Sequence, residues 1–182
     1  MKATGIVRRI DDLGRVVVPK EIRRTLRIRE GDPMEIFTAK EGEVILKKYS
    51  PMGEIGNYAE EYAKAMAQVG EVTVIITDRD QVIAAAGKNK RDYAGKNISA
   101  SLEEIMEERE VVSTVTKPKS KRPVIEGEDI TEIGQIIYPV ICHGDVIGVV
   151  GMISKDDVSK LSEAEEKIVS VAALFLGSHM ET

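Results

Sequence analysis

Apolar and polar residues alternate over short distances in the first fifty residues, which is typical of strands. Because these runs are also rich in β-branched side chains, we predict four short strands, at residues 4–10, 15–18, 34–38 and 43–48. Asp11, Asp12 and Gly14 are turn formers between the first two strands. Lys40-Glu41-Gly42 joins the last two, with a glycine available for positive φ.

A short helix is predicted at residues 19–27, between the two strand pairs. Pro19 suits its first position, where the missing N–H is not needed. Ile22 and Leu26 then fall on one face and arginines on another, because residues three or four apart share a helix face.

Proline and glycine in Tyr49-Ser50-Pro51-Met52-Gly53 interrupt this pattern. We therefore expect a first domain at 1–50, a linker at 51–55 and a second domain at 56–182.

The second part alternates between helical and strand patterns. Helices are predicted at 54–69, at 101–109 behind the capping box Ser101-x-x-Glu104, and after Ser162-x-x-Glu165. Strands are predicted at 72–77, 82–86, 111–116, 135–141 and 146–153. The first and last helices carry apolar residues seven apart, namely Ile55, Tyr62 and Val69, and Leu161, Ile168 and Phe175. This order predicts an α/β domain with a mostly antiparallel sheet flanked by helices, two of which pack together.

Charge is divided unevenly between the two parts. Residues 1–50 carry 12 Lys and Arg against 8 Asp and Glu, and the rest carries 14 against 23, so net charges of +4 and −9 make up the overall −5. A basic first part on an acidic second part suggests that only the first meets a polyanion, although two ordinary solvated surfaces would also fit.

Length and composition exclude several classes of protein. No apolar run approaches a membrane span, and no signal peptide precedes the first strand, so we expect a cytoplasmic protein without a membrane partner. A single cysteine, Cys142, excludes an internal disulfide and a cysteine-cluster metal site. A domain of fifty residues without a disulfide or a metal site buries too little apolar surface to be stable alone. The first domain is therefore expected to dimerise.

The stretch from Thr4 to Leu26, with Gly31–Ile36 and Val44–Tyr49 after it, closely resembles the AbrB-type DNA-binding module of transition-state regulators. The resemblance implies an all-β swapped-hairpin barrel, in which two chains exchange hairpins to close one core. It also implies double-stranded, A+T-rich DNA as the partner. The residues matching the family's DNA contacts are Arg8, Arg15, Arg23 and Arg24, with Arg9 where the family also tolerates lysine.

Arginine suits this role because its planar guanidinium pairs bidentately with guanine or phosphate oxygens. Taken singly, each arginine could equally be a solvated strand end. Lys47 is a further candidate phosphate contact, for which a solvated strand end is an equal alternative.

The segment from Tyr138 to Ile141, followed by Gly144–Ser154, resembles the closing hairpin of GAF domains. The resemblance implies a pocket for an unidentified small molecule, with no other cofactor, and assembly of dimers into a homotetramer. The combination of the two domains resembles regulators that activate and repress sporulation genes, which would place the protein on the nucleoid of the forespore.

Two other functions fit the sequence less well. An antitoxin carries a similar β-module, but over a hundred patterned residues follow it here instead of a floppy tail. An enzyme would need an acid, base, nucleophile or metal cluster. Asp11 and Asp12 are explained by a turn, and Cys142 and His143 are turn neighbours that cannot easily bond as nucleophile and base. We therefore expect no catalytic and no metal-binding residues.

Overall fold

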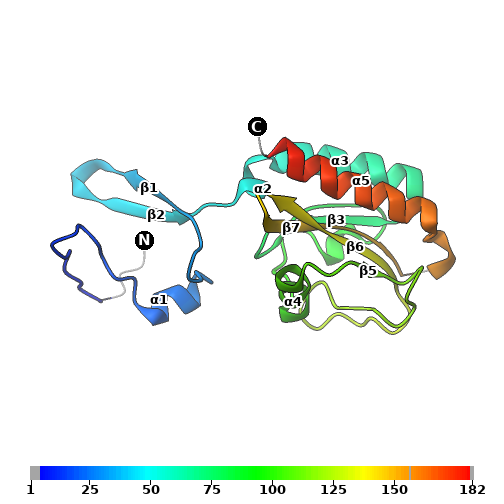
Figure 1. Ribbon diagram of the computed structural model, residues 1–182, viewed down its shortest axis with the longest axis horizontal. Helices are drawn as coiled ribbons and strands as arrows, with labels where there is room; N and C mark the ends of the chain where they lie inside the picture. Colours follow the sequence, from blue (N-terminus) through cyan, green and yellow to red (C-terminus); the bar gives the residue numbers. More distant parts are fainter. Residues whose placement is uncertain (1–4, 156, 181–182) are drawn as a thin grey trace. The chain divides into compact units, whose positions relative to one another are not determined.

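The computed structural model describes residues 5–155 and 157–180. The chain divides into two compact units, Met1–Tyr49 and Ser50–Thr182 (Figure 1). We call them the head and the body and describe each by itself.

The head contains one short helix and one hairpin. Helix α1 spans Lys20–Thr25, and strands β1 (Met34–Thr38) and β2 (Val44–Lys48) pair antiparallel across the 3-10 turn η1 (Lys40–Gly42). The hairpin is confirmed almost residue for residue, with Gly42 at φ 81° in the turn. Pro19, however, is the N-cap of α1 and not its first helical residue.

The described parts of the first two expected strands, residues 5–10 and 15–18, do not pair with each other or with another described strand. The turn between them forms, with the Gly14 amide donating to the Asp11 carbonyl at 3.0 Å, but residues 5–10 and 15–18 join no sheet. Thr4 lies outside the described residues. An isolated pair of short strands is only marginally stable, so these segments need a further strand as partner, and residues 5–155 and 157–180 supply none.

The head has almost no core of its own. Pro19 is the single buried residue among those described in the head. Its large apolar side chains are exposed, at Ile6, Val7, Ile10, Leu13, Val16, Val17, Leu26, Ile36, Phe37, Val44 and Leu46. A folded domain rarely leaves so many of its large apolar side chains in water, so these side chains are expected to have a partner.

The body is an antiparallel five-stranded sheet in the order β4-β3-β7-β6-β5. Its strands are β3 (Thr73–Thr77), β4 (Val82–Ala86), β5 (Val112–Ser113), β6 (Gly134–Cys142) and β7 (Asp145–Ser154). Helices α3 (Gly56–Gly70) and α5 (Glu163–His179) cover one face, and α4 (Ala100–Glu108) covers the other (Figure 1). Two short 3-10 turns complete it, η2 (Lys90–Asp92) and η3 (Val158–Lys160).

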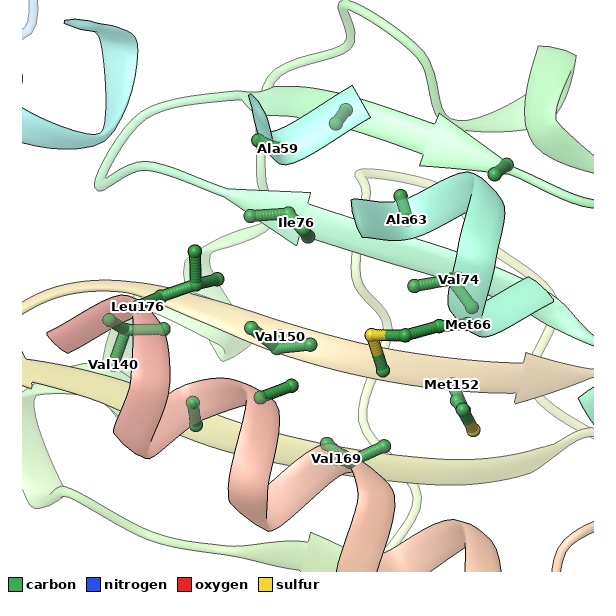
Figure 2. Packing of buried hydrophobic residues seen from close by; sticks show 14 of the residues in the cluster. Ala59, Ala63, Met66, Val74, Ile76, Val140, Val150, Met152, Val169 and Leu176 are labelled. Atoms are coloured by element: carbon green, nitrogen blue, oxygen red, sulfur yellow. The ribbon is translucent and has the colours of Figure 1, made fainter. Parts of the chain in front are cut away.

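Small side chains bring the helices close to the sheet. Ala59, Ala63 and Met66 of α3 pack over β3 and β4, while Val169 and Leu176 of α5 pack over β6 and β7 (Figure 2). A Cβ added at Gly177 of α5 would lie 2.1 Å from the Ile141 carbonyl oxygen, so only glycine fits there.

The structure corrects two expectations about where helices start. The N-cap of α4 is Ser99 and not Ser101, since the Ser99 hydroxyl accepts from the Leu102 amide at 3.1 Å. The expected linker at 51–55 is instead helix α2 (Pro51–Glu54), whose Met52 is buried in the body core. The capping box at Ser162 and Glu165 is confirmed.

The residues seven apart on and beside α3 and α5 run from buried to exposed. Ile55 and Leu161 are buried in the body core, and Tyr62 and Ile168 pack against it half-buried. The two helices do pack together, since the Tyr62 and Phe175 rings stack with centroids 5.7 Å apart. Val69 is 72% exposed, and Val171, Leu174 and Phe175 are also exposed, so these four side chains lie on the outer side of the helices.

Within residues 5–155 and 157–180, no helix combines the length and apolar character that crossing a membrane requires.

Candidate DNA-binding interface

Three of the candidate arginines flank the Asp11–Gly14 turn. Arg8 and Arg9 lie on the segment before it and Arg15 directly after it, and all three are exposed. The turn is closed by the Asp11 amide, which donates to the Arg15 carbonyl at 3.0 Å. Arg8 and Arg15 are therefore presented on the two arms of one turn.

Asp11 organises this turn and holds the side chain of Arg15. Its Oδ1 accepts from the amides of Leu13 (3.0 Å) and Arg15 (2.8 Å), and its Oδ2 accepts from Arg15 Nε at 2.9 Å. The bond from the Arg15 amide, followed by those from the Arg15 side chain and the Leu13 amide, holds the pKa of Asp11 below its ordinary value. The terminal nitrogens of Arg15 have no partner in the described chain, which leaves its two-pronged end free for a ligand.

Replacing Asp11 with asparagine is expected to loosen the turn and weaken DNA binding. Because the folded pKa is lowered, the ordering is present above the ordinary aspartate pKa and is lost as pH falls through the folded value. Amide hydrogen exchange at Leu13 and Arg15 should accelerate in the variant at neutral pH. In the wild type the protection of these amides, relative to the intrinsic exchange rate at the same pH, should fall on acidification.

Asp12→Asn is the matched control, because Asp12 forms no bond in the described chain. Its DNA affinity shows how much binding improves when one negative charge near the DNA is removed. Relative to it, Asp11→Asn should bind DNA roughly two- to tenfold more weakly, the range for losing one preorganised side chain. Equal affinities of the two variants would show that Asp11 does not position Arg15.

The other two arginines, Arg23 and Arg24, lie in the last turn of α1. Arg24 is exposed, whereas Arg23 is half-buried and its Nε is a buried donor without an acceptor in the described chain. A buried donor without an acceptor lowers the stability of the fold. We therefore expect a water molecule or a bound partner to supply an acceptor for Arg23 Nε.

A buried carboxylate fixes the end of α1 to the hairpin. Asp32, with a side chain only 2% exposed, accepts from Lys48 Nζ at 3.0 Å and from the Arg29 amide at 2.7 Å. Lys48 also donates to the Arg27 carbonyl at 3.0 Å. Lys48 is thus a structural residue of the head, while Lys47 is exposed with its Nζ 4.9 Å from the Phe37 ring centre.

The candidates therefore form three groups, on the first turn, on α1 and, for Lys47, on β2. Sequence reasoning missed the positioning roles of Asp11 and Asp32. An Asp followed by Arg at i+4 across a Gly-containing turn was the available signal for the first. No local signal marks the Asp32–Lys48 pair, which joins residues 16 positions apart.

The body offers hollows but no catalytic centre in its described residues. Acidic and basic loop residues, among them Asp92, Lys96, Glu128 and Lys155, line an open hollow of about 610 Å³. Burial, with Glu128 accepting from the hydroxyl, raises the pKa of Tyr93 beneath it. No group of three or more His, Cys, Asp or Glu in the described chain could hold a metal ion.

Comparison with known proteins places both units. Residues 54–181 match the family "Stage V sporulation protein T C-terminal, transcription factor". Residues 7–54 match "Antidote-toxin recognition MazE, bacterial antitoxin". Over 51 residues, 28% of this chain and 52% of the relative, the head is 61% identical to the transition state regulatory protein AbrB of Bacillus subtilis. The head is thus an AbrB-type DNA-binding domain.

Solved structures identify the fold of the body. A methyl-accepting chemotaxis protein, residues 122 to 287, superposes with a TM-score of 0.56 at 16% identity, covering 69% of this chain and 88% of that one. The GAF domain of an Acinetobacter phosphoenolpyruvate-protein phosphotransferase gives 0.51 at 18% identity, covering 74% and 84%. The body therefore has the GAF fold.

One relative spans both units. The stage V sporulation protein T of Bacillus subtilis is 52% identical over 182 residues, which is 100% of this chain and 99% of that protein. The family that this relative's name shares with the match to residues 54–181 is one of transcription factors and not of enzymes. The chain belongs to the stage V sporulation protein T family of transcription factors.

Proposed function

We propose that the protein activates and represses sporulation genes in the forespore cytoplasm by binding A+T-rich double-stranded DNA as a dimer of heads. The observation that carries this is the set of exposed arginines on a turn and a helix of an AbrB-type domain. The proposed contacts are Arg8, Arg9, Arg15, Arg23, Arg24 and Lys47.

These side chains can both position and choose DNA. Arg9 and Lys47 are suited to phosphate, which sets register without reading bases. The forked end of Arg15 is suited to guanine edges or to a narrow minor groove. Flexible A+T-rich sites fit shape readout by such a surface.

Salt dependence of the full chain's DNA affinity tests the proposal. Each phosphate contact should add about −0.9 to the slope of log affinity against log salt concentration. With six candidate residues in each of the two heads of a dimer, the affinity is expected to fall steeply as salt concentration rises. A salt-independent affinity would contradict an arginine and lysine interface.

We further propose that bodies assemble head dimers into tetramers through the outer face of α3 and α5. This face carries an apolar hollow of about 460 Å³ lined by residues such as Tyr58, Tyr62 and Phe175. Val171 and Leu174 beside it are 61% and 70% exposed. Within the described chain, no other element covers these two side chains of α5.

Val171→Glu combined with Leu174→Glu should convert tetramers into dimers in sedimentation equilibrium. The double control Val111→Glu and Ile141→Glu alters apolar residues that are 38% and 41% exposed elsewhere on the body. Tetramers of the α5 variant, or equal dissociation of the control, would contradict the assembly face.

A small-molecule ligand of the body remains part of the proposal. A ligand shifts DNA affinity only as far as its own affinity differs between the free and DNA-bound states. A thermal-shift screen of metabolites on the full chain, followed by DNA titrations with each hit, tests it. Hits that leave DNA affinity unchanged would contradict sensing.

A further inference from the structure

The body has one stretch whose charge opposes the rest. Between Glu110 and Glu126 there is no carboxylate, yet Lys117, Lys119, Lys121 and Arg122 follow within six residues. The remainder of residues 51–182 holds 10 Lys and Arg against 23 Asp and Glu. We call residues 117–122 the basic loop.

The basic loop is held in place by buried side chains. Gln135, fully buried, accepts from the Arg122 amide at 2.8 Å and donates to the Arg122 carbonyl at 2.6 Å. At the other end, the Lys117 amide donates to the Ser113 carbonyl at 2.9 Å. A buried amide that satisfies one loop residue at both its donor and its acceptor restricts the backbone there.

Two more contacts and two prolines restrict the loop further. The Ser120 hydroxyl lies 2.8 Å from the Lys117 carbonyl and 3.2 Å from the Ser113 carbonyl. Lys121 Nζ donates to the Thr131 carbonyl at 2.8 Å. Pro118 and Pro123 limit the backbone of the loop. Binding a ligand there requires little further ordering of the backbone.

The charges themselves are uncompensated. Lys117 and Lys119 are exposed, and none of the four cations forms an ion pair in the described chain. Uncompensated cations grouped on an ordered loop favour a polyanion, because binding releases that polyanion's condensed counterions.

We propose that the basic loop contacts the phosphate backbone of duplex DNA beyond the stretch bound by the head. DNA is the occupant because the head is a DNA-binding domain, so a duplex held there is tethered near the body at high local concentration. Lysine suits this role, since it meets phosphate as a point charge and carries no base preference. The proposal rests on DNA binding by the head.

The test compares the full chain with Lys117→Ala plus Lys119→Ala on two kinds of duplex. One is the shortest duplex that still binds, and the other is extended on both sides. On the extended duplex the variant should lose on the order of tenfold in affinity at low salt, and the salt slope should fall by about 1.8 per engaged copy. On the shortest duplex it should bind like the wild type.

Lys90→Ala plus Arg91→Ala is the matched control, since both residues are exposed on η2 of the same unit without ion pairs in the described chain. Equal losses in the control, or an unchanged affinity of the loop variant on the extended duplex, would overturn the proposal. If Arg15→Ala lost all DNA binding while the Lys117→Ala plus Lys119→Ala variant bound like the wild type, DNA binding by the head would be supported and the role of the basic loop contradicted.

Discussion

Arg15→Ala or Arg23→Ala is expected to abolish specific DNA binding while the chain stays assembled. Asp11 binds Arg15 through Nε, and the Arg15 side chain is 69% exposed. The terminal nitrogens of Arg15 therefore face solvent and form no bond within the described head. Arg23 brings a buried Nε that lacks an acceptor in the described chain. Neither side chain therefore contributes a bond that holds α1 to the hairpin.

The size of the loss follows from symmetry. A good bidentate contact is worth about 1–3 kcal/mol, and a dimer loses two per substitution, which corresponds to roughly 30-fold to 10⁴-fold in affinity. Gel shifts or anisotropy titrations at fixed salt measure it, and sedimentation checks assembly.

Two further variants separate charge from geometry. Arg15→Lys keeps the charge but removes the fork, so it should recover only the non-specific part of binding. Arg27→Ala removes one exposed arginine outside the candidate set. Normal binding by Arg15→Ala and Arg23→Ala, or equal loss in Arg27→Ala, would contradict the assignment of contacts.

Val17→Asp is expected to unfold the head and prevent its dimerisation. Val17 is 72% exposed and Val7 86% exposed in one chain, in a unit with Pro19 alone buried among its described residues. Burying such a side chain in a dimer core contributes about 1.5–3 kcal/mol. An aspartate there would instead bury a charge in each of two copies.

Ala39→Asp is the matched control for Val17→Asp. It adds the same charge at an exposed N-cap of η1, where aspartate is favoured. Sedimentation and circular dichroism of residues 1–50 should show monomeric, unfolded Val17→Asp beside a dimeric, folded control. A folded Val17→Asp head would mean that this apolar surface is not a core.

Sequence patterns predicted correctly the elements whose formation depends on neighbouring residues alone. The β1–β2 hairpin, strand β4 and the capping box at Ser162 follow from turn residues, alternation and a short-range side-chain bond. The start of α4 was predicted wrongly because a distant contact decides it. The Ser99 amide donates to the Val124 carbonyl at 2.8 Å, which holds Ser99 extended and makes it the cap in place of Ser101.

The remaining differences concern pairing and packing between distant segments. Residues 5–10 and 15–18 have strand-forming side chains, but strand pairing needs a neighbour that no local pattern reveals. The residues seven apart on α3 predicted its packing against α5, and Tyr62 does stack on Phe175. The pattern did not reveal that Ala59 and Ala63 face the sheet, because close approach of a helix to a sheet favours small side chains.

The candidate site was predictable as a set of residues and not as an arrangement. Arginine positions came from a family likeness, whereas the hold of Asp11 on Arg15 and of Asp32 on Lys48 needed coordinates. Lys48 shows the limit plainly, since it is adjacent to the candidate Lys47 in the sequence, yet its ammonium group is bound by the buried carboxylate of Asp32.

Two heads together are expected to hold one DNA duplex through their arginines. Sedimentation equilibrium of residues 1–50 mixed with a short labelled A+T-rich duplex measures this stoichiometry. We expect a folded dimer in the free state and two copies per duplex in the complex. A stable folded monomer, or one copy bound per duplex, would contradict it.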